Sequence, residues 1–229
     1  MSLYFYENEA RNAGYNTIAG VDEAGRGPLA GPVVVAACIL PPFFEAKDLN
    51  DSKLLTEKKR SELFHLLTND PNIHYAIRII DHKKIDRINI LQATLDGMKS
   101  AVKNLPVRPD FVLIDGNSAP KIEIPLKTIV DGDKLSASIA AASILAKVTR
   151  DQWMLKLDKK YPKWNFMKHK GYGTKEHLDL IEQHGLSPVH RTSFAPIRNY
   201  MNYMKIPKKE RFEQMDLGML FLKDPQNIT

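Results

Sequence analysis

The residues best suited to chemistry are acids that interrupt or follow apolar, strand-like runs. Four of them share this setting: Asp22, Glu23, Asp115 and Asp133. A charge at such a point costs free energy unless it is paired or coordinated. Strand ends are rigid mounts, and if these strands are neighbours in one sheet the carboxylates converge. Carboxylate oxygens suit Mg²⁺ or Mn²⁺ better than zinc.

Two such ions about 3.5 to 4 Å apart can activate a water and stabilise the leaving oxygen of an in-line displacement at phosphorus. The alternative for any single acid at a strand end is a turn residue or a solvated charge. The joint occurrence of the four acids therefore carries the hypothesis of metal-dependent phosphodiester chemistry.

The elements that would position these acids alternate between strands and helices. Thr17 to Val21 predicts a strand that ends before the first acid pair, and a Gly- and Pro-rich turn follows it. Further along the chain we expect strands at 33–40, 73–80, 111–115 and 127–130, and helices at 56–67, 88–105, 135–157 and 174–184, with a charged helical candidate at 207–223.

The composition is that of an ordinary globular protein with a mild bias toward anionic partners. The 229 residues include 33 Lys and Arg against 27 Asp and Glu, so the formal charge is +6. The single cysteine, Cys38, excludes an intramolecular disulfide and fits a reducing cytoplasm. We find no signal peptide and no apolar run that could span a bilayer, so we predict a cytoplasmic protein without membrane contact.

Five ordered stretches resemble one known family. They are GVDEAGRGPLAGPVVVAA at 20–37, DSKLLTEKKR at 51–60, LIDG at 113–116, GDKLSASIAAASILAKVTRD at 132–151 and HKGYGTKEH at 169–177. Together they resemble the type 2 ribonucleases H, specifically bacterial ribonuclease HII. The resemblance implies an α/β, ribonuclease H-like fold, with a mixed central sheet flanked by helices and a helical C-terminal extension.

The resemblance also implies an activity. Similar enzymes are endoribonucleases that cleave the RNA strand of RNA/DNA hybrids and the 5′ side of single ribonucleotides embedded in duplex DNA, leaving 3′-hydroxyl and 5′-phosphate ends. The pattern of the residues, with no repeat and no long linker, favours one catalytic domain at 1–205 and a helical extension at 206–229 packed on it. We expect a monomer whose partner is the hybrid or ribonucleotide-containing duplex; a sliding clamp as a further partner stays open.

Residue by residue, the family's catalytic, metal-binding quartet falls on Asp22, Glu23, Asp115 and Asp133. Asp131 is the rival for the last position. We prefer Asp133 because the family pattern is Gly-Asp with Ser three residues after the Asp, and here Ser136 follows Asp133 at that spacing. The resemblance implies Mg²⁺ or Mn²⁺ as the cofactor.

The segment Gly25, Arg26 and Gly27 resembles the family's ribonucleotide sensor, whose main-chain groups reach the sugar 2′-hydroxyl. Glycine lets the backbone approach a sugar, and the 2′-hydroxyl distinguishes RNA from DNA. Tyr172 matches a family tyrosine that packs against the following sugar. Without the surrounding motifs, a Gly-rich turn and a surface aromatic would explain these residues equally well.

Several basic residues lie in or beside the matching stretches and could bind the phosphate backbone: Lys53, Lys147, Arg150, Lys168 and Lys170. The alternative for each is an ordinary surface charge. Three histidines, His169, His177 and His190, invite a zinc hypothesis, but the chain has one cysteine and no compact ligand spacing. We interpret the histidines as structural or peripheral.

Three competing interpretations fit these residues less well. A junction resolvase of the same fold would share clustered acids but lack the Gly-Arg-Gly segment and the tyrosine. A catalytically dead binding module would have lost an acid, and all four positions are filled. Ribonuclease HIII carries an extra N-terminal domain and a different final acid, whereas here the first motif begins at Gly20 and Asp stands at 133. The tail from Pro207 matches nothing in the family pattern.

Overall fold

The computed structural model describes residues 2–42, 44, 49 and 55–205. The chain divides into two compact units. The first unit comprises residues 1–26, 32–80 and 91–153, and the second comprises 27–31, 81–90 and 154–229. Lys53 and the predicted extension at 206–229 lie outside the described residues.

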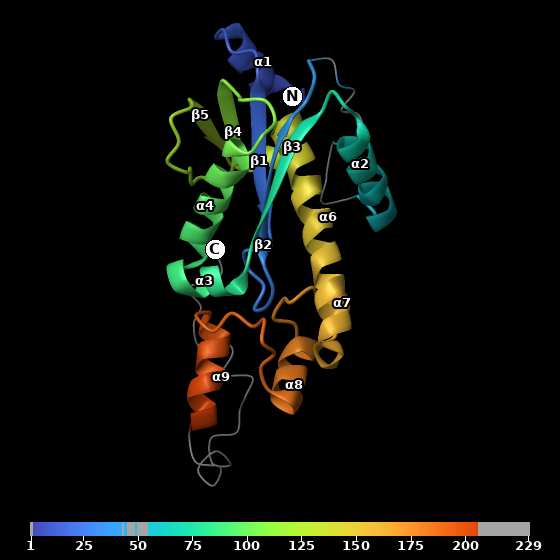
Figure 1. The fold of residues 1–229 in the computed structure, drawn as a ribbon, viewed down its shortest axis with the longest axis vertical. Coiled ribbons are helices and arrows are strands. Elements are labelled where there is room, and N and C mark those ends of the chain that lie inside the picture. Colours follow the sequence, from blue (N-terminus) through green and yellow to red (C-terminus); the bar gives the residue numbers. More distant parts are fainter. Residues whose placement is uncertain (1, 43, 45–48, 50–54, 206–229) are drawn as a thin grey trace. The chain divides into compact units, whose positions relative to one another are not determined.

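The first unit is built around a five-stranded sheet in the order β3-β2-β1-β4-β5 (Figure 1). Strands β1, β2 and β3 pair antiparallel, whereas β4 pairs parallel with both β1 and β5. The elements of this unit are α1 (Phe5–Asn12), β1 (Ile18–Ala24), β2 (Val33–Ile39), α2 (Glu57–Asn69), β3 (His74–Ile80), α4 (Ile90–Lys103), β4 (Phe111–Asp115), β5 (Leu126–Ile129), α5 (Gly132–Leu135) and the start of α6 (Ala137–Lys160).

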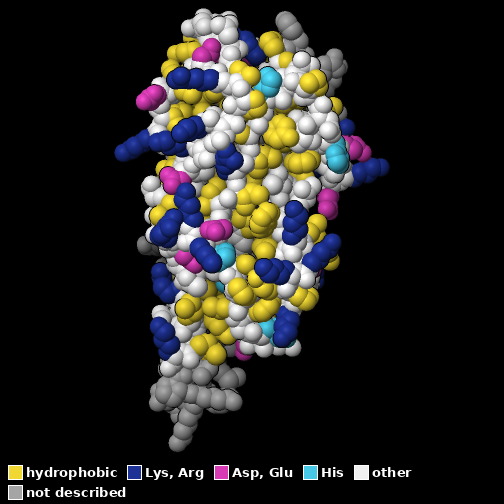
Figure 2. Space-filling model, viewed as in Figure 1, with side chains coloured by type: hydrophobic (Ala, Val, Ile, Leu, Met, Phe, Trp, Pro, Cys, Tyr) yellow, Lys and Arg dark blue, Asp and Glu magenta, His cyan; other side chains and the backbone are white. Residues whose placement is uncertain are grey.

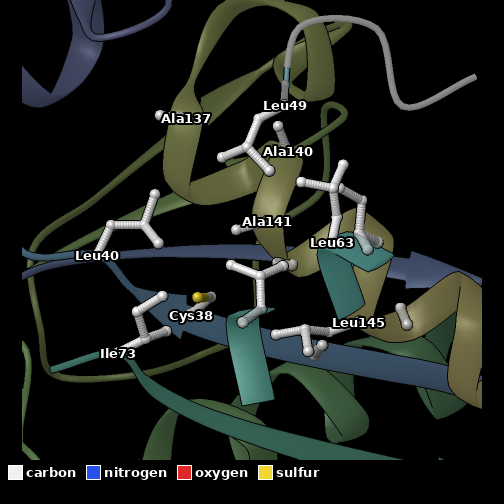
Figure 3. Close-up of a cluster of buried hydrophobic side chains, with 14 of the residues drawn as sticks. Cys38, Leu40, Leu49, Leu63, Ile73, Ala137, Ala140, Ala141 and Leu145 are labelled. Atoms are coloured by element: carbon white, nitrogen blue, oxygen red, sulfur yellow. The ribbon is translucent and has the colours of Figure 1, made fainter. Parts of the chain in front are cut away.

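Helices cover both faces of this sheet because β2 is apolar on both sides. Val34, Ala36 and Cys38 belong to a buried cluster with small and branched residues of α6 and with α2 (Figure 3). On the opposite face, α4 lies so close that a Cβ added at Gly97 would be 2.8 Å from Cγ2 of Val35. Successive residues of a strand face opposite sides, so this packing fixes the register of β2 between the two helical layers.

The closest approach of helix and sheet is at Gly20 of β1. A Cβ there would lie 2.1 Å from the carbonyl carbon of Ser138, at the start of α6. Alanines 140, 141 and 142 of α6 are fully buried. Small residues on both elements therefore bring the backbone of α6 against β1, the strand that carries Asp22 and Glu23.

The second unit is mostly helical. Its elements are α3 (His82–Ile88), η2 (Pro162–Trp164), α7 (Phe166–His169), α8 (Lys175–His184) and α9 (Ala195–Lys205). Asp86 of α3 accepts four hydrogen bonds, from the main-chain N–H and the hydroxyl of both Thr192 and Ser193, at 2.6 to 2.9 Å. These bonds fasten α3 to the segment that leads into α9.

The sequence predictions hold for the sheet and differ elsewhere. β1 continues through Asp22 and Glu23, because these residues pair with Ala36 and Val35 of β2. The helix expected at 88–105 begins at Ile90, since Asn89 has φ 65° and separates it from α3. The helix expected from 135 begins at Ala137, after an extended Ser136. The short elements α3, α5, η2 and α7, and the helices α1 and α9, were not predicted.

Threonine side chains cap the first turns of two helices. Thr56 caps α2 and Thr174 caps α8, with hydroxyls that accept from the N–H of Lys59 and His177. No helix in the described part of the chain is both long and apolar enough to cross a membrane.

Candidate active site

Parallel pairing of β1 and β4 brings Asp22 and Asp115 to the same sheet edge. The register aligns Val21 with Ile114, so the next residue on each strand is an aspartate. Residues aligned on adjacent parallel strands point to the same face, and the strands lie about 4.8 Å apart. The sequence predicts that the carboxylates converge if their strands are neighbours. Because β1 and β4 are neighbours in the sheet, Asp22 and Asp115 meet this condition.

Asp22 is 5% exposed and is surrounded by other acids. Its Oδ1 accepts from the N–H of Glu23 at 2.6 Å, and the hydroxyl of Ser143 donates to the same carboxylate. Burial, followed by repulsion from Glu23 and from Asp115, raises the pKa of Asp22 well above its usual value, against these two hydrogen bonds. Ser143 was not singled out in the sequence, where it reads as one more small residue on α6.

Glu23 has one oxygen engaged and one buried without a partner. Nη1 of Arg26 lies 3.2 Å from its Oε1, whereas its Oε2 is buried and has no hydrogen-bond partner among the described residues. Burial raises the pKa of Glu23 and repulsion from Asp115 adds to it, against the attraction of Arg26. A buried carboxylate oxygen without a donor is costly unless a cation approaches it.

The loop after β5 is tied to Asp115. The N–H of Gly132 donates to Oδ1 of Asp115 at 2.7 Å, and a Cβ at Gly132 would be 3.1 Å from that oxygen. This bond brings the neighbouring Asp133, 2% exposed, to the Asp115 side of the sheet. Asp131 is exposed and pairs with Lys134 at 3.2 Å, so the burial of the two rivals favours Asp133.

A buried glutamate of α1 holds the junction that follows Asp133. Oε1 of Glu7 accepts from the hydroxyl of Ser136 at 2.6 Å, and from the N–H and hydroxyl of Ser138 at 2.9 and 2.7 Å. A carboxylate at a helix N-terminus also complements the helix dipole. Sequence reasoning missed this contact, since nothing local to α1 distinguishes Glu7 from the exposed Glu9.

Arg150 requires a correction to both sequence interpretations, which treated it as a surface charge or a phosphate contact. It is 1% exposed, and its Nε donates to the carbonyl of Pro32 at 3.1 Å. Gly25, with φ 94°, packs directly on it, so that a Cβ at Gly25 would lie 1.9 Å from Nε of Arg150. The guanidinium packs against the turn at Gly25 and supports it. The positive φ and this contact both require glycine at that position.

In the second unit, residues 27–31 lie between two other segments. The N–H of Leu29 donates to the carbonyl of Gly171 at 2.8 Å, and the N–H of Gly31 donates to the carbonyl of Val189 at 3.0 Å. A Cβ at Gly27 would be 3.8 Å from Cε1 of Tyr172, whose side chain is exposed. The structure therefore places the last glycine of the Gly-Arg-Gly segment beside Tyr172.

The predicted basic residues differ in their surroundings. Lys147 pairs with Asp151 and Lys168 pairs with Glu176, at 2.8 and 2.7 Å, and Lys170 occupies a left-handed turn with φ 52°. Figure 2 shows Lys and Arg side chains spread over the visible face, among hydrophobic and other side chains. On this face, charge alone therefore does not mark a binding surface.

In the described part of the chain, no group of three or more Asp, Glu, His or Cys side chains is already arranged to hold a metal ion. Oxygens of Asp115 and Glu23 are engaged by Gly132 and Arg26 instead. The donor chemistry nevertheless fits a hard divalent cation, because the ligands available are carboxylates that repel one another.

Comparison with known proteins decides the family. The family model described as Ribonuclease HII matches residues 19–197. The chain belongs to the ribonuclease HII family. Ribonuclease HII of Desulfitobacterium hafniense is 58% identical over 189 residues, which are 82% of this chain and 72% of that protein. Ribonuclease HII of Chlamydia caviae is 52% identical over 198 residues, covering 86% and 93%.

The fold agrees as well. The crystal structure of ribonuclease H2 from Pyrococcus horikoshii matches with a TM-score of 0.72 and 26% identity, over 84% of this chain and all of that one. The predicted family, fold class and enzyme class are thereby confirmed: the protein is a hydrolase of the ribonuclease H type, acting on the RNA of RNA/DNA hybrids. Ribonucleases H depend on divalent metal ions.

Proposed function

We propose that this member of the ribonuclease HII family also cleaves on the 5′ side of a single ribonucleotide embedded in duplex DNA, leaving 3′-hydroxyl and 5′-phosphate ends. The observation that carries the proposal is the continuity of one short segment. Asp22 and Glu23 lie in the last three residues of β1, which ends at Ala24, and Gly25, Arg26 and Gly27 follow directly. The residues proposed for chemistry and those proposed for recognising a 2′-hydroxyl are therefore coupled along the backbone.

We propose that Asp22, Glu23, Asp115 and Asp133 hold Mg²⁺ or Mn²⁺. The support is the all-carboxylate donor set, the buried Oε2 of Glu23, and the pKa values of Asp22 and Glu23, which burial and mutual repulsion raise. When bound, such ions would supply an activated water and stabilise the leaving 3′-oxygen.

The chain's own residues orient these acids. The N–H of Glu23 and the hydroxyl of Ser143 fix the Asp22 carboxylate, and the N–H of Gly132 fixes Asp115. Glu7 immobilises the start of α6 just after Asp133. A site built on strand ends with such support keeps its geometry during turnover, and outer contacts of this kind commonly change metal affinity or activity by about 10- to 100-fold.

For substrate selection, we propose that main-chain groups of Gly25, Arg26 and Gly27 approach the 2′-hydroxyl, and that Tyr172 stacks on the following sugar. Lys147, Lys168 and Lys170 would contact phosphates without reading sequence. Arg150, being buried, would act by holding the turn at Gly25. The same role in phosphate binding remains proposed for Lys53, which lies outside the described residues.

Three further proposals concern the state of the protein. We propose a monomer, with residues 1–205 as the catalytic domain and 206–229 as an extension packed on it. We also propose a cytoplasmic location; its support is that the chain has a single cysteine, Cys38, and so no intramolecular disulfide, which fits a reducing compartment. Size-exclusion chromatography with light scattering tests the first proposal.

The deciding assay uses a labelled DNA duplex that holds one ribonucleotide, incubated with the protein and either Mg²⁺ or Mn²⁺. We expect one cut on the 5′ side of the ribonucleotide, with a product that a DNA polymerase extends from its 3′-hydroxyl. An all-DNA duplex and the Asp115→Asn variant serve as controls. An intact ribonucleotide duplex beside a cleaved RNA/DNA hybrid would overturn the proposal while leaving hybrid cleavage in place.

A further inference from the structure

Three buried histidines of the second unit form one stack behind the Tyr172 loop. The ring centroids of His169 and His177 are 4.1 Å apart, and those of His177 and His190 are 5.1 Å apart. The exposed fractions of these residues are 6%, 0% and 2%. Phe166 contacts all three rings. Nothing in the proposed chemistry uses these groups.

Main-chain donors fix the tautomer of two of the rings. The N–H of Ser187 donates to Nδ1 of His190 at 2.8 Å, and the N–H of Gly171 donates to Nδ1 of His169 at 3.1 Å. A main-chain amide can only donate, so each of these Nδ1 atoms must carry a lone pair. The proton of each neutral ring is therefore on Nε2.

The direction of the remaining bonds follows from this assignment. Nε2 of His190 lies 3.0 Å from Nε2 of His177, so His190 donates and His177 accepts. The proton of His177 is then on Nδ1, which lies 2.9 Å from the carbonyl oxygen of Tyr172. The result is a one-way series of hydrogen bonds that runs from Ser187 through His190 and His177 to Tyr172. Nε2 of His169 donates separately to the carbonyl of Trp164 at 2.6 Å.

The series works only with neutral rings. A second proton on Nδ1 of His190 would break the bond from the N–H of Ser187, and the protonated Nδ1 could then donate only to the Ser187 hydroxyl at 2.8 Å or the Ser187 carbonyl at 3.3 Å. A second proton on His177 would place two N–H groups against each other at His190. Burial lowers the pKa of His177 to about 3 and that of His190 to about 4, with repulsion among the rings adding to the effect at His177. Burial also lowers the pKa of His169.

The end of the series is a tight loop. Gly171 has φ 82°, and a Cβ there would be 2.6 Å from the carbonyl oxygen of Ala30. The carbonyl of Gly171 accepts from Leu29, and the N–H of Tyr172 donates to the carbonyl of His169 at 2.9 Å. The main chain at Tyr172 is thus held on one side by residues 27–31 and on the other by His177.

We propose that His177 and His190 are positioning residues: their tautomer-locked hydrogen bonds fix the main chain of Tyr172, and with it the ring that stands beside Gly27. The inference rests on the proposed function, in which Tyr172 contacts a substrate sugar. The two histidines touch no substrate. They act through the loop, so their loss should weaken substrate binding more than the rate of the bound complex.

The matched pair of variants is His177→Phe and His177→Asn. Phenylalanine keeps an aromatic ring in the stack and removes the donor, whereas the asparagine amide can place an N–H where Nδ1 stood. We expect His177→Phe to raise KM for the single-ribonucleotide duplex about five- to tenfold, the size of one lost hydrogen bond, with kcat within about twofold. His177→Asn should recover most of that loss. Equal KM values for the wild type and both variants would overturn the proposal, as would a loss confined to kcat.

A second measurement is independent of activity and of whether a variant folds. Imidazole ¹⁵N chemical shifts of the wild-type protein at pH 7 should show the Nδ1–H tautomer for His177 and the Nε2–H tautomer for His190. The opposite tautomers, or a charged ring at either position, would refute the proposed series of hydrogen bonds from Ser187 to Tyr172. If the wild type leaves the ribonucleotide duplex uncut but cleaves an RNA/DNA hybrid, the proposed function fails, and the KM comparison is then made on the hybrid.

Discussion

The protein buries two groups of titratable side chains, and they are held in opposite ways. In the first unit, burial and like charge act together on Asp22 and Glu23 and raise their pKa values. In the second unit, the rings of His177 and His190 have fixed hydrogen-bond partners at both nitrogens and stay neutral. A bound cation could relieve the burial and the repulsion that act on the carboxylates. The neutral histidine rings carry no charge that a cation would neutralise. The difference is the one expected if the acids serve chemistry and the histidines serve support, as we propose.

A third acid, Asp86, shows the opposite shift of pKa. Asp86 is also partly buried, which opposes ionisation, yet the hydrogen bonds from Ser193 and Thr192 lower its pKa. Donors are therefore available to carboxylates elsewhere in this chain. At β1 the carboxylate of Asp22 also accepts two hydrogen bonds, but burial and the nearby charges of Glu23 and Asp115 outweigh them.

The largest expected effect is on catalysis. Asp115→Asn should reduce cleavage of an RNA/DNA hybrid by more than about a hundredfold, beyond the range typical of outer contacts to a metal site. Asparagine keeps the acceptor for Gly132 and removes a repelling charge, so the variant should be at least as stable as the wild type at pH 7. Initial cleavage rates and urea denaturation measure the two quantities. Asp131→Asn is the control; an equal loss of activity there would assign the fourth position of the quartet to Asp131 instead of Asp133.

Glu7→Ala tests the support behind Asp133. It leaves the buried hydroxyls of Ser136 and Ser138 without their acceptor, and we expect a loss of about 3 kcal/mol in the free energy of unfolding. Glu9→Ala on the same helix removes an exposed ion pair with Lys127 and should cost at most about 1 kcal/mol. Chemical denaturation of both variants is the measurement, and similar losses for the two would contradict the contrast.

The lowered pKa values of the buried histidines predict that the free energy of unfolding falls on acidification. Their pKa values in the folded protein, about 3 for His177 and about 4 for His190, lie below the ordinary 6.5 of the unfolded chain. Between these values the unfolded state binds more protons, so stability is complete above pH 6.5 and declines as pH falls toward 4. At pH 5 each histidine should cost about 2 kcal/mol relative to pH 7.5. His177→Asn should show a shallower decline by urea denaturation; an unchanged slope would mean that His177 is not buried neutral.

The smallest expected effect concerns Asp86. Its folded-state pKa is lowered, so its contribution is present above the ordinary pKa near 4 and is lost as pH falls further. Asp86→Asn should cost about 1 kcal/mol at neutral pH, a value kept small because the group is largely exposed. The difference from the wild type should shrink toward pH 3. A constant difference across that range would assign the effect to packing.

The adjacent placement of Asp22 and Asp115 could be predicted in part, because a charge within an apolar run is a local signal. The strand at 111–115 and its terminal Asp115 follow from five adjacent letters. The course of β1 through Asp22 and Glu23 did not follow, because pairing with β2 overrides the local preference for a turn. Family resemblance, and not periodicity, separated Asp133 from Asp131.

The supporting contacts were not predictable from the sequence. Glu7 meets Ser138 across a sequence separation of 131 residues. Arg150 reads as a helix surface charge until Gly25 is seen packed on it. The histidine tautomers depend on main-chain amides of Gly171 and Ser187, which no side-chain pattern reveals.

The most direct test of the central claim is thermal unfolding in the presence of a divalent cation. If the buried acids are a cation site, Tm of the wild type should rise with Mn²⁺ or Mg²⁺ concentration and reach saturation, because an ion that binds only the folded state stabilises it. Asp115→Asn should lose most of this rise, and Asp131→Asn should keep it. An equal rise in the wild type and in Asp115→Asn, or no rise in the wild type, would contradict the account.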